Sequence, residues 1–326
     1  MTAPRFDGLR DFVQHLEAHG ELLRVTAEVD PKFEVAEIVQ RVIRQDGPAL
    51  LFERVKGADF PLAMNLYGSS RRMEMAIGRP PELIGRELID TFQRLNPPSL
   101  GKFWELRATL LKARFLRPRM VRHAPVQEVV EEAPRLDRFP NLWSWPRDGG
   151  PFITFGPTIT HNPASGVRNF GLYRLQVFDG QTTGMHWQSM KGGRGHHHEA
   201  ERRGESLEAA VVLGGDPMTM LSAILPLPED FDELGLAGFL RGRATRFSRQ
   251  GGGEVARRHP VAVGVDAEGA RRLGLLGPGR DDFALGRAEV DEGVPVERGG
   301  AGGAVGARVD TEGGELHELV PSTCTR

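Results

Sequence analysis

Hydrophobic positions in the first third of the chain alternate between the spacing of a helix and the spacing of a strand. Helical spacing, with apolar residues every three or four positions, covers residues 7–19, 33–44, 81–95 and 103–115. Strand-like alternation covers residues 21–29, 49–55 and 61–66. Because short strands alternate with helices, this pattern predicts an N-terminal α/β domain over residues 1–115.

The pattern changes after a basic, proline-containing stretch at 116–125, which we interpret as a linker. Short strand-like segments punctuated by Pro and Gly then recur up to about residue 250. They cover residues 152–162, 169–178, 185–190, 209–215 and 220–228. Such a series predicts a mainly β domain with inserted helices, folded as a barrel or a strongly curved sheet. The predicted fold class is therefore α+β, with the second domain spanning residues 116–250.

The segment 168–187 has the features of a β-hairpin, with Asp179-Gly180 as its turn. Its first strand carries Asn169 and Arg174, which strict alternation would place on opposite faces of the sheet. A bulge at Gly171 would instead bring both side chains towards one site. An arginine within an apolar strand can grip a carboxylate or phosphate, although an edge strand can also present such an arginine to solvent.

Composition narrows the function classes. A hydrophobic fraction of 39%, a charged fraction of 26% and a formal net charge of -2 are typical of a soluble globular protein and give no indication of a nucleic-acid partner. The single cysteine, Cys324, excludes an internal disulfide. The N-terminus lacks the apolar core of a signal peptide and no apolar run is long enough to span a bilayer, so a cytoplasmic location is expected.

Carboxylates in the segment 226–242 are candidate metal ligands. They are Glu229, Asp230, Asp232 and Glu233. One of them could join Asn169 in binding a hard divalent cation, which prefers carboxylate and amide oxygens. The alternative is an acidic, solvated helix N-terminus, where the helix dipole favours negative charge without any metal.

Three adjacent histidines, residues 196–198, form a second candidate metal site. Structural zinc ligands are usually spaced apart and no cysteine partner is near, so a polar surface loop is the favoured interpretation, with a metal-dependent hydrolase as a weaker alternative. The preceding segment 191–195, KGGRG, could bring backbone N–H groups and Lys191 to a phosphate. His161 and His186 stand alone in apolar segments and are interpreted as core or rim residues.

Residues 251–326 differ in kind from the rest of the chain. Seventeen of these 76 residues are Gly, and Phe283 is their only aromatic residue. So little large apolar surface favours a disordered tail. The abundance of Gly, Ala, Arg, Val and Asp, whose codons are rich in G, is equally typical of a change of reading frame.

The motifs of about residues 5–242 resemble those of the UbiD family of decarboxylases, which use prenylated FMN. The resemblance rests on FDGLRDFVQHLEAHGELLRV, VDPKFEVAEI, GPALLFERVKG, LWSWPRDGGPFITFGPTIT, RNFGLYRLQVF, MHWQSMKGG and LGGDPMTMLSAILPLPEDFDELGLAGFLRG. It implies a split β-barrel that binds the modified flavin, a divalent metal such as Mn2+, and K+. It also implies reversible, non-oxidative loss of carbon dioxide from an aromatic or α,β-unsaturated acid.

The resemblance also assigns roles by position. Asn169 and Glu233 match the family's metal ligands, which favours a metal site over the solvated helix end. Arg174 matches the arginine that holds the substrate carboxylate. The positions that match residues around the flavin are Leu172, Tyr173, Arg174, His186, Trp187, Gln188, Lys191 and Gly192, the last two in the loop at its phosphate.

The resemblance ends near Gly242. The family's later β-rich segment, which carries the catalytic acid, has no match, and Glu254, Asp281 and Asp282 lack its motif. We therefore expect a truncation or a change of reading frame, and an incomplete barrel with unpaired strand edges. A catalytically inactive flavin-binding remnant is the alternative to a working enzyme.

Partners and substrate are implied by the resemblance alone. It implies a flavin prenyltransferase as supplier of the cofactor, a homo-oligomer if the chain is intact, and a cytoplasmic protein that could be peripheral to the membrane. A polyprenyl-4-hydroxybenzoate of quinone biosynthesis is one substrate option, and other aromatic or acrylic acids are further options.

Overall fold

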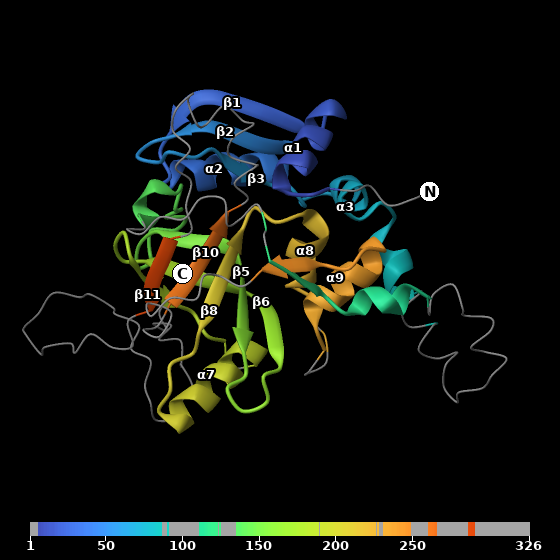
Figure 1. The fold of residues 1–326 in the computed structure, drawn as a ribbon. Coiled ribbons are helices and arrows are strands. Elements are labelled where there is room, and N and C mark those ends of the chain that lie inside the picture. The colour runs from blue at the N-terminus through green and yellow to red at the C-terminus, as the bar shows by residue number, and fades with distance from the viewer. Residues whose placement is uncertain are drawn as a thin grey trace, which may run out of the picture. The chain divides into compact units, whose positions relative to one another are not determined.

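The computed structural model describes residues 6–86, 90, 111–122, 124, 135–188, 190–225, 227 and 231–248, together with the backbone of 260–265 and 286–290. Figure 1 shows the helices and strands of this part of the chain. The predicted fold class is confirmed, since an α/β layer at the N-terminus precedes a β-rich domain with inserted helices.

The N-terminal layer is a three-stranded sheet in the order β1-β2-β3. β1 (Leu22–Val29) runs parallel to β2 (Ala49–Val55), and β3 (Leu62–Met64) returns antiparallel to β2. The connection from β1 to β2 contains helix α2 (Glu34–Arg44), because a parallel pair needs a long crossover. All four elements lie where the apolar spacing predicted them.

The core of this layer forms between α2 and the sheet. Val35 and Val39 contribute from α2, while Leu50 and Phe52 contribute from β2, all at most 6% exposed. Leu142, which precedes β5 in the predicted second domain, is buried in the same cluster. Burying one such side chain stabilises folding by roughly 1.5–3 kcal/mol, so the cluster anchors Leu142 to the N-terminal layer.

Six strands of the second domain form a hydrogen-bonded ring in the order β10-β11-β7-β6-β5-β8. They are β5 (Phe152–His161), β6 (Arg168–Val177), β7 (Thr182–Met185), β8 (Ala209–Leu213), β10 (Pro260–Val265) and β11 (Gly286–Val290). β6 is antiparallel to both β5 and β7, which confirms the predicted hairpin. The β8–β10 and β11–β7 contacts are parallel. The split form of the barrel stays a prediction.

β10 and β11 belong to the segment that composition predicted to be a disordered tail. The ring closes through these two strands, where the sequence predicted unpaired edges. Their sequences, PVAVGV and GRAEV, contain the β-branched residues that favour strands. The remainder of residues 251–326 lies outside the described part of the chain.

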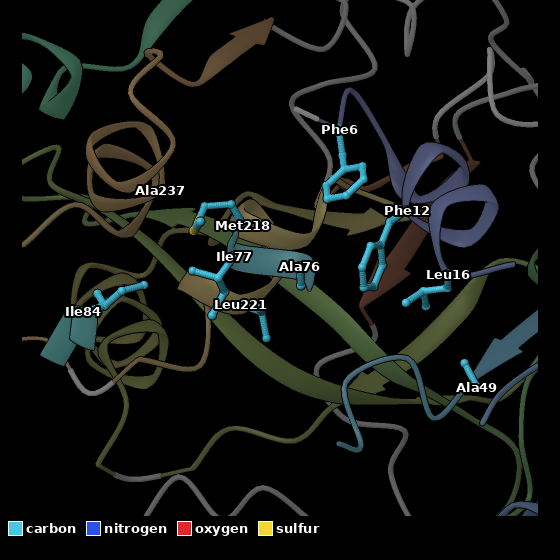
Figure 2. Packing of buried hydrophobic residues seen from close by; sticks show 10 residues of the cluster. All are labelled: Phe6, Phe12, Leu16, Ala49, Ala76, Ile77, Ile84, Met218, Leu221 and Ala237. Atoms are coloured by element: carbon cyan, nitrogen blue, oxygen red, sulfur yellow. The ribbon is translucent and has the colours of Figure 1, made fainter. Parts of the chain in front are cut away.

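Helices α1 (Leu9–Ala18), α3 (Ser70–Ile77), α8 (Pro217–Ser222) and α9 (Glu233–Arg241) share a second core. The buried residues of this cluster, shown in Figure 2, are Phe6, Phe12, Leu16, Ala49, Ala76, Ile77, Ile84, Met218, Leu221 and Ala237. The cluster joins residues from both predicted domains, and the boundary between them stays a prediction.

Four further segments differ from the sequence prediction. The predicted strand at 185–190 is strand only at Met185, where β7 ends, among its described residues. The predicted linker contains β4 (Arg119–Val121), which pairs in parallel with β9 (Arg246–Ser248). The predicted strand at 220–228 begins instead as the end of α8, because Asp216 caps that helix and a proline occupies its first turn. The predicted histidine loop is helix α7 (Gly192–Arg203).

The two helices predicted between 81 and 115 are described only at their ends. Residues 81–86 are helical, and residues 111–112 lead into a 3-10 turn, η1 (Ala113–Leu116), while almost all positions between them lie outside the described residues. A second 3-10 turn, η3 (Leu136–Arg138), precedes β5. Within the described ranges, no helix has both the length and the apolar character needed to cross a bilayer.

Candidate active site along strand β6

On one edge of β6, β7 pairs only with Leu175–Val177. Along the rest of that edge, single groups from other elements form the hydrogen bonds. The Phe170 N–H donates to Glu233 Oε2 at 3.0 Å, and the Leu172 N–H donates to the Ala223 carbonyl at 3.1 Å. A buried strand N–H without an acceptor would be costly, so these two groups complete the strand edge. The first residue of α9 is thereby placed beside the predicted site.

The carbonyls of the same edge are covered by the segment that follows β7. Lys191 Nζ donates to the Leu172 carbonyl at 3.0 Å, and the His186 N–H donates to the Arg174 carbonyl at 3.0 Å. The Lys191 N–H donates to the Gln188 carbonyl at 3.0 Å, which turns the segment back on itself. The side chains of His186 and Gln188 are exposed, so only their backbone positions are fixed by the strand.

One face of β6 is organised by the Tyr173 hydroxyl. It accepts hydrogen bonds from the Gly193 N–H at 2.7 Å and from Asn169 Nδ2 at 3.3 Å. The Tyr173 ring meets Trp187 edge-on, with the ring centroids 5.0 Å apart. Burial raises the pKa of the Tyr173 hydroxyl, so the group stays protonated at neutral pH. We call Asn169, Tyr173, Trp187, Gly192 and Gly193 the Tyr173 cluster.

Two glycines allow α7 to begin against this face. A Cβ on Gly192 would lie 2.5 Å from Asn169 Oδ1. A Cβ on Gly193 would lie 2.7 Å from the Trp187 ring and closer still to the Tyr173 hydroxyl. The glycines of KGGRG therefore act as the close-packed start of a helix, and their proposed approach to a phosphate stays a prediction.

Arg174 contacts two residues that the sequence did not point to. Nη1 donates to Asp148 Oδ1 at 3.0 Å, and Nη2 donates to Asp148 Oδ2 at 2.7 Å. The guanidinium carbon also lies 3.7 Å from the centroid of the Phe152 ring. The alternative of a solvated edge-strand arginine is therefore wrong. Arg174 Nε is buried and has no hydrogen-bond partner among the described residues.

A bulge lies opposite Arg174, although not where the sequence predicted it. Gly171 pairs in regular register with Thr158, so the predicted bulge at Gly171 is wrong. The register shift lies in β5, where residues 154–155 oppose the single residue Arg174. A bulge increases the local twist and re-aims nearby side chains. Asn169 and Arg174 stay on opposite faces of β6, as strict alternation requires.

Glu233 is the first residue of α9 and directly follows the N-cap residue of this helix, Asp232. Asp232 Oδ1 accepts the Leu234 N–H at 3.1 Å, and Asp232 also forms an ion pair with Arg168 of β6. Burial raises the pKa of the Glu233 carboxyl, although the Phe170 N–H and a backbone hydrogen bond of Glu233 itself oppose the shift. Glu233 forms no ion pair within the described part of the chain, so this half-buried carboxylate is a position where a bound cation would be stabilising.

Asn169 and Glu233 supply the oxygen types that a hard divalent cation prefers. The Asn169 side chain donates to Tyr173, whereas Glu233 accepts from the backbone of the next residue, Phe170. The two side chains thus lie beside neighbouring positions of one strand. In the part of the chain that the structure describes, no three His, Cys, Asp or Glu side chains gather closely enough to hold a metal. The metal assignment stays a prediction.

The three adjacent histidines have different surroundings on α7. Nδ1 of His196 lies 2.9 Å from Thr160 Oγ1, and both residues are buried. Nδ1 of His197 lies 2.8 Å from Arg194 Nη1, while the His198 side chain is 70% exposed. The loop prediction is therefore wrong for all three, which lie on α7, and the surface prediction is wrong for His196 and His197, which are buried. Nδ1 of His197 and Nδ1 of His198 lie 3.4 and 3.7 Å from Glu201 Oε2, but no metal-holding group of three such side chains is found among the described residues, which gives no support to a hydrolase centre.

Taken together, a ring of six strands carries the clamped arginine on β6 and the half-buried glutamate at the edge of the same strand. Family models identify the two regions of the chain. Residues 13–92 match the 3-octaprenyl-4-hydroxybenzoate carboxy-lyase N-terminal domain, and residues 119–256 match the Rift-related domain of the same carboxy-lyase. The chain belongs to the UbiD family.

Curated relatives cover the same part of the chain. An uncharacterized protein of Archaeoglobus fulgidus is 43% identical over 238 residues, which are 72% of this chain and 49% of the relative. One from Aquifex aeolicus is 38% identical over 272 residues, which are 81% of this chain and 55% of the relative. The chain thus spans about half the length of the curated relatives it matches.

Solved structures of UbiD-class enzymes share the fold. HmfF from Pelotomaculum thermopropionicum, in complex with FMN, is 28% identical with a TM-score of 0.60, and the match covers 76% of this chain and 51% of HmfF. Vanillic acid decarboxylase from Sedimentibacter hydroxybenzoicus, in its closed form, is 23% identical with a TM-score of 0.64, covering 80% and 57%. The second likeness concerns the fold alone.

Proposed function

We propose that this chain acts in the non-oxidative decarboxylation of an aromatic or α,β-unsaturated carboxylic acid. Membership of a carboxy-lyase family supports the reaction class. The observation that carries the proposal is the state of Arg174. Its guanidinium is clamped on a β-strand and keeps a buried Nε–H without an acceptor among the described residues. A substrate carboxylate is the natural acceptor for such a donor.

Prenylated FMN is the proposed cofactor, because HmfF was solved with FMN and, in an evolved dimeric form, with prenylated FMN. When bound, this flavin supplies the electron sink for the bond that breaks. The fit rests on the Lys191 ammonium, a cation held at the strand edge beside the start of α7. The N–H groups of Gly193, Arg194 and Gly195 already donate to Tyr173 and Lys191, so the ammonium is the proposed phosphate contact. The residues proposed around it are Leu172, Tyr173, Arg174, His186, Trp187, Gln188, Lys191 and Gly192.

A divalent cation such as Mn2+, and K+, complete the proposed cofactor set. Asn169 and Glu233 are the proposed ligands of the divalent ion. Support comes from the raised pKa of the Glu233 carboxyl, which indicates a carboxylate whose charge is poorly compensated by the described residues. A bound cation would remove that cost.

The chain's own residues have three tasks in this proposal. Arg174 holds the substrate carboxylate through charge-assisted hydrogen bonds and so fixes the orientation of the bond to be broken. The Tyr173 cluster packs the opposite face of β6 and keeps that strand rigid. Glu233 and Lys191 fix the strand edge. The acid that returns a proton to the substrate carbon is not among the assigned residues.

The substrate and partners are proposed more broadly. A polyprenyl-4-hydroxybenzoate is one option, since both family models carry the name of that carboxy-lyase. A flavin prenyltransferase is the proposed supplier of the cofactor. A homo-oligomer is proposed because one of the similar solved structures is an evolved dimeric form.

The test is to co-express the full chain with a flavin prenyltransferase in the presence of manganese, and to measure its absorption spectrum, its flavin by mass spectrometry and its metal content. Arg174→Ala, Glu233→Ala and an exposed control, Glu205→Ala, are purified in parallel. We expect bound flavin and metal in the wild type and the control, loss of metal in Glu233→Ala, and flavin without carboxylate binding in Arg174→Ala.

Two outcomes would contradict the proposal. Folded wild-type chain that takes up no flavin would favour the inactive remnant. Bound flavin with unchanged metal content in Glu233→Ala would remove Glu233 from the metal site. A screen of aromatic and acrylic acids for release of carbon dioxide then defines the substrate.

A further inference from the structure

A closed loop, residues 142–152, carries Asp148 to the arginine; we call it the Asp148 loop. Its base is formed by two backbone hydrogen bonds, from the Leu142 N–H to the Phe152 carbonyl at 3.1 Å and from the Phe152 N–H to the Leu142 carbonyl at 2.9 Å. Leu142 is buried in the core of the N-terminal layer. The loop therefore starts from that core and ends as the first residue of β5.

A second anchor follows at Trp143. Its N–H donates to the Pro31 carbonyl at 3.2 Å, and its carbonyl accepts the Phe33 N–H at 2.9 Å. The Lys32 ammonium lies 4.3 Å from the centroid of the Trp143 ring. Phe33 holds this position with a φ of 70°, a backbone region that bulky residues rarely adopt. Such strain persists where the surroundings over-determine the conformation, which indicates a firmly fixed anchor.

The tip of the Asp148 loop lies against β6. The Asp148 N–H donates to the Trp145 carbonyl at 3.0 Å, which forms the turn. A Cβ on Gly149 would be 3.0 Å from the Gln176 side chain, and one on Gly150 would be 3.3 Å from it. Glycines thus let the loop approach the strand closely, two residues from Arg174.

The guanidinium of Arg174 has two edges that can each bind a carboxylate. The end formed by Nη1 and Nη2 is taken by both oxygens of Asp148. The side formed by Nε and the second N–H of Nη2 is left, and Nε is buried without an acceptor in the described part of the chain. A buried donor without an acceptor is unfavourable, so a ligand that supplies an acceptor is bound more tightly.

We infer that Asp148 is a positioning residue. It holds Arg174 by one edge of the guanidinium so that the other edge, Nε with Nη2, receives the carboxylate of the substrate. The inference rests on the proposed function, in which Arg174 binds that carboxylate. Phe152 completes the arrangement, because the guanidinium carbon lies over its ring, 3.7 Å from the centroid, and this contact restricts the motion of the guanidinium.

The Nε–H proton of Arg174 reports directly on this arrangement. A mobile arginine loses its Nε–H signal through fast exchange with water, whereas a clamped and buried one keeps it. The full chain is labelled with 15N-arginine, and the Arg174 signal is identified by its absence in Arg174→Lys. Sodium benzoate serves as the probe carboxylate.

We expect a protected Arg174 signal in the wild type that moves when benzoate is added. Asp148→Asn, which keeps the shape but loses the charge, should lose the protected signal and bind benzoate about tenfold more weakly, the equivalent of one charge-assisted hydrogen bond. Asp148→Glu should restore the signal at a new position. Asp137→Asn, which removes the exposed Arg135–Asp137 ion pair, should change neither.

Two results would overturn the inference. An unchanged, protected signal in Asp148→Asn would mean that another group holds the arginine. Tighter benzoate binding by Asp148→Asn would mean that Asp148 competes for the substrate's place. A signal that depends on Asp148 but does not respond to benzoate in the wild type would support the positioning role and contradict the proposed function of Arg174 instead.

Discussion

Tyr173 and Arg174 are consecutive residues of β6 whose side chains have separate partners on opposite faces of the sheet. The Tyr173 hydroxyl accepts from Gly193 and Asn169, whereas the Arg174 guanidinium donates to Asp148. One strand therefore links two polar groups that cannot touch each other. Disturbing one should leave the partners of the other in place, and this separation can be tested.

Tyr173→Phe should lower the free energy of unfolding by about 1–3 kcal/mol, because it leaves the buried Gly193 N–H without its acceptor. Tyr67→Phe is the matched control. The Tyr67 hydroxyl is buried and has no partner within the described ranges, so its removal should be neutral or slightly stabilising. Urea unfolding measures both, and equal losses would show that the Gly193 hydrogen bond contributes nothing.

Gly193→Ala should destabilise the chain by about 1–3 kcal/mol, because the new methyl group would overlap the Tyr173 hydroxyl and the Trp187 ring. Gly195→Ala, two residues further along α7, should stabilise it by about 0.5–1 kcal/mol. There a Cβ meets no described atom within 4 Å, and alanine favours the helix. Thermal unfolding distinguishes the two, and a stabilising Gly193→Ala would refute the close packing.

The raised pKa of Glu233 predicts a pH dependence. Its protonated form is favoured in the folded chain, so its contribution to stability is fully present below the ordinary value of 4.5 and is lost as the pH rises through the raised pKa. Glu233→Gln mimics the protonated form. At neutral pH the flavin-free and metal-free variant should be more stable than the wild type, by up to about 1 kcal/mol after solvent screening.

Urea unfolding at a series of pH values measures this difference, and Glu205→Gln, on the surface, serves as the control. The advantage of Glu233→Gln should shrink as the pH falls towards 4.5, because the wild type then binds the proton itself. An advantage independent of pH would show that Glu233 does not titrate differently in the folded state.

Among the adjacent histidines, His196→Ala should cost about 1–3 kcal/mol of unfolding free energy, because it leaves the buried Thr160 hydroxyl without its partner on α7. His198→Ala should stay within about 0.5 kcal/mol, since that side chain is exposed. Alanine at all three positions should leave the manganese content of folded, loaded protein unchanged. Complete loss of bound metal would revive the hydrolase alternative.

Local spacing was enough to predict the N-terminal layer. β2 was predicted at its observed bounds, Ala49–Val55, because its apolar residues follow one another between clear turn signals. The hairpin of β6 and β7 was predicted from Asp179-Gly180, although β7 ends at Met185, where the return strand was expected to begin. In these elements, residues that are adjacent in the sequence determine the backbone conformation.

Tertiary contacts decided the elements that the sequence missed. Every residue of α8 is buried, so its sequence shows no polar face and has the appearance of a buried strand. α7 begins with glycines, which by themselves favour a loop. The helix start is fixed by a tertiary contact, because the Tyr173 hydroxyl accepts the Gly193 N–H. Both show that amphipathic spacing fails where a helix is enclosed or is fixed at one end by another element.

The site residues also fall into two groups, those that the sequence predicted and one that only the fold reveals. Asn169, Arg174 and Glu233 could be chosen from residue type and family motif. Asp148 could not, because it lies 26 positions before Arg174 and meets it only through the fold of the loop. A signal was present in the WPRDGG motif, where an aspartate precedes two glycines, but its partner is not encoded in local spacing.

The Asp148 loop has a consequence for the exchange of segments between relatives. Its base is tied to the N-terminal core by Leu142, and its tip holds the arginine of the second domain. A chimaera joined at the predicted domain boundary near residue 115 would combine the N-terminal layer of one parent with the Asp148 loop of the other. The N-terminal layer and residues 142–152 should therefore come from the same parent. Chimaeras that take them from different parents should fold but hold Arg174 in a wrong position.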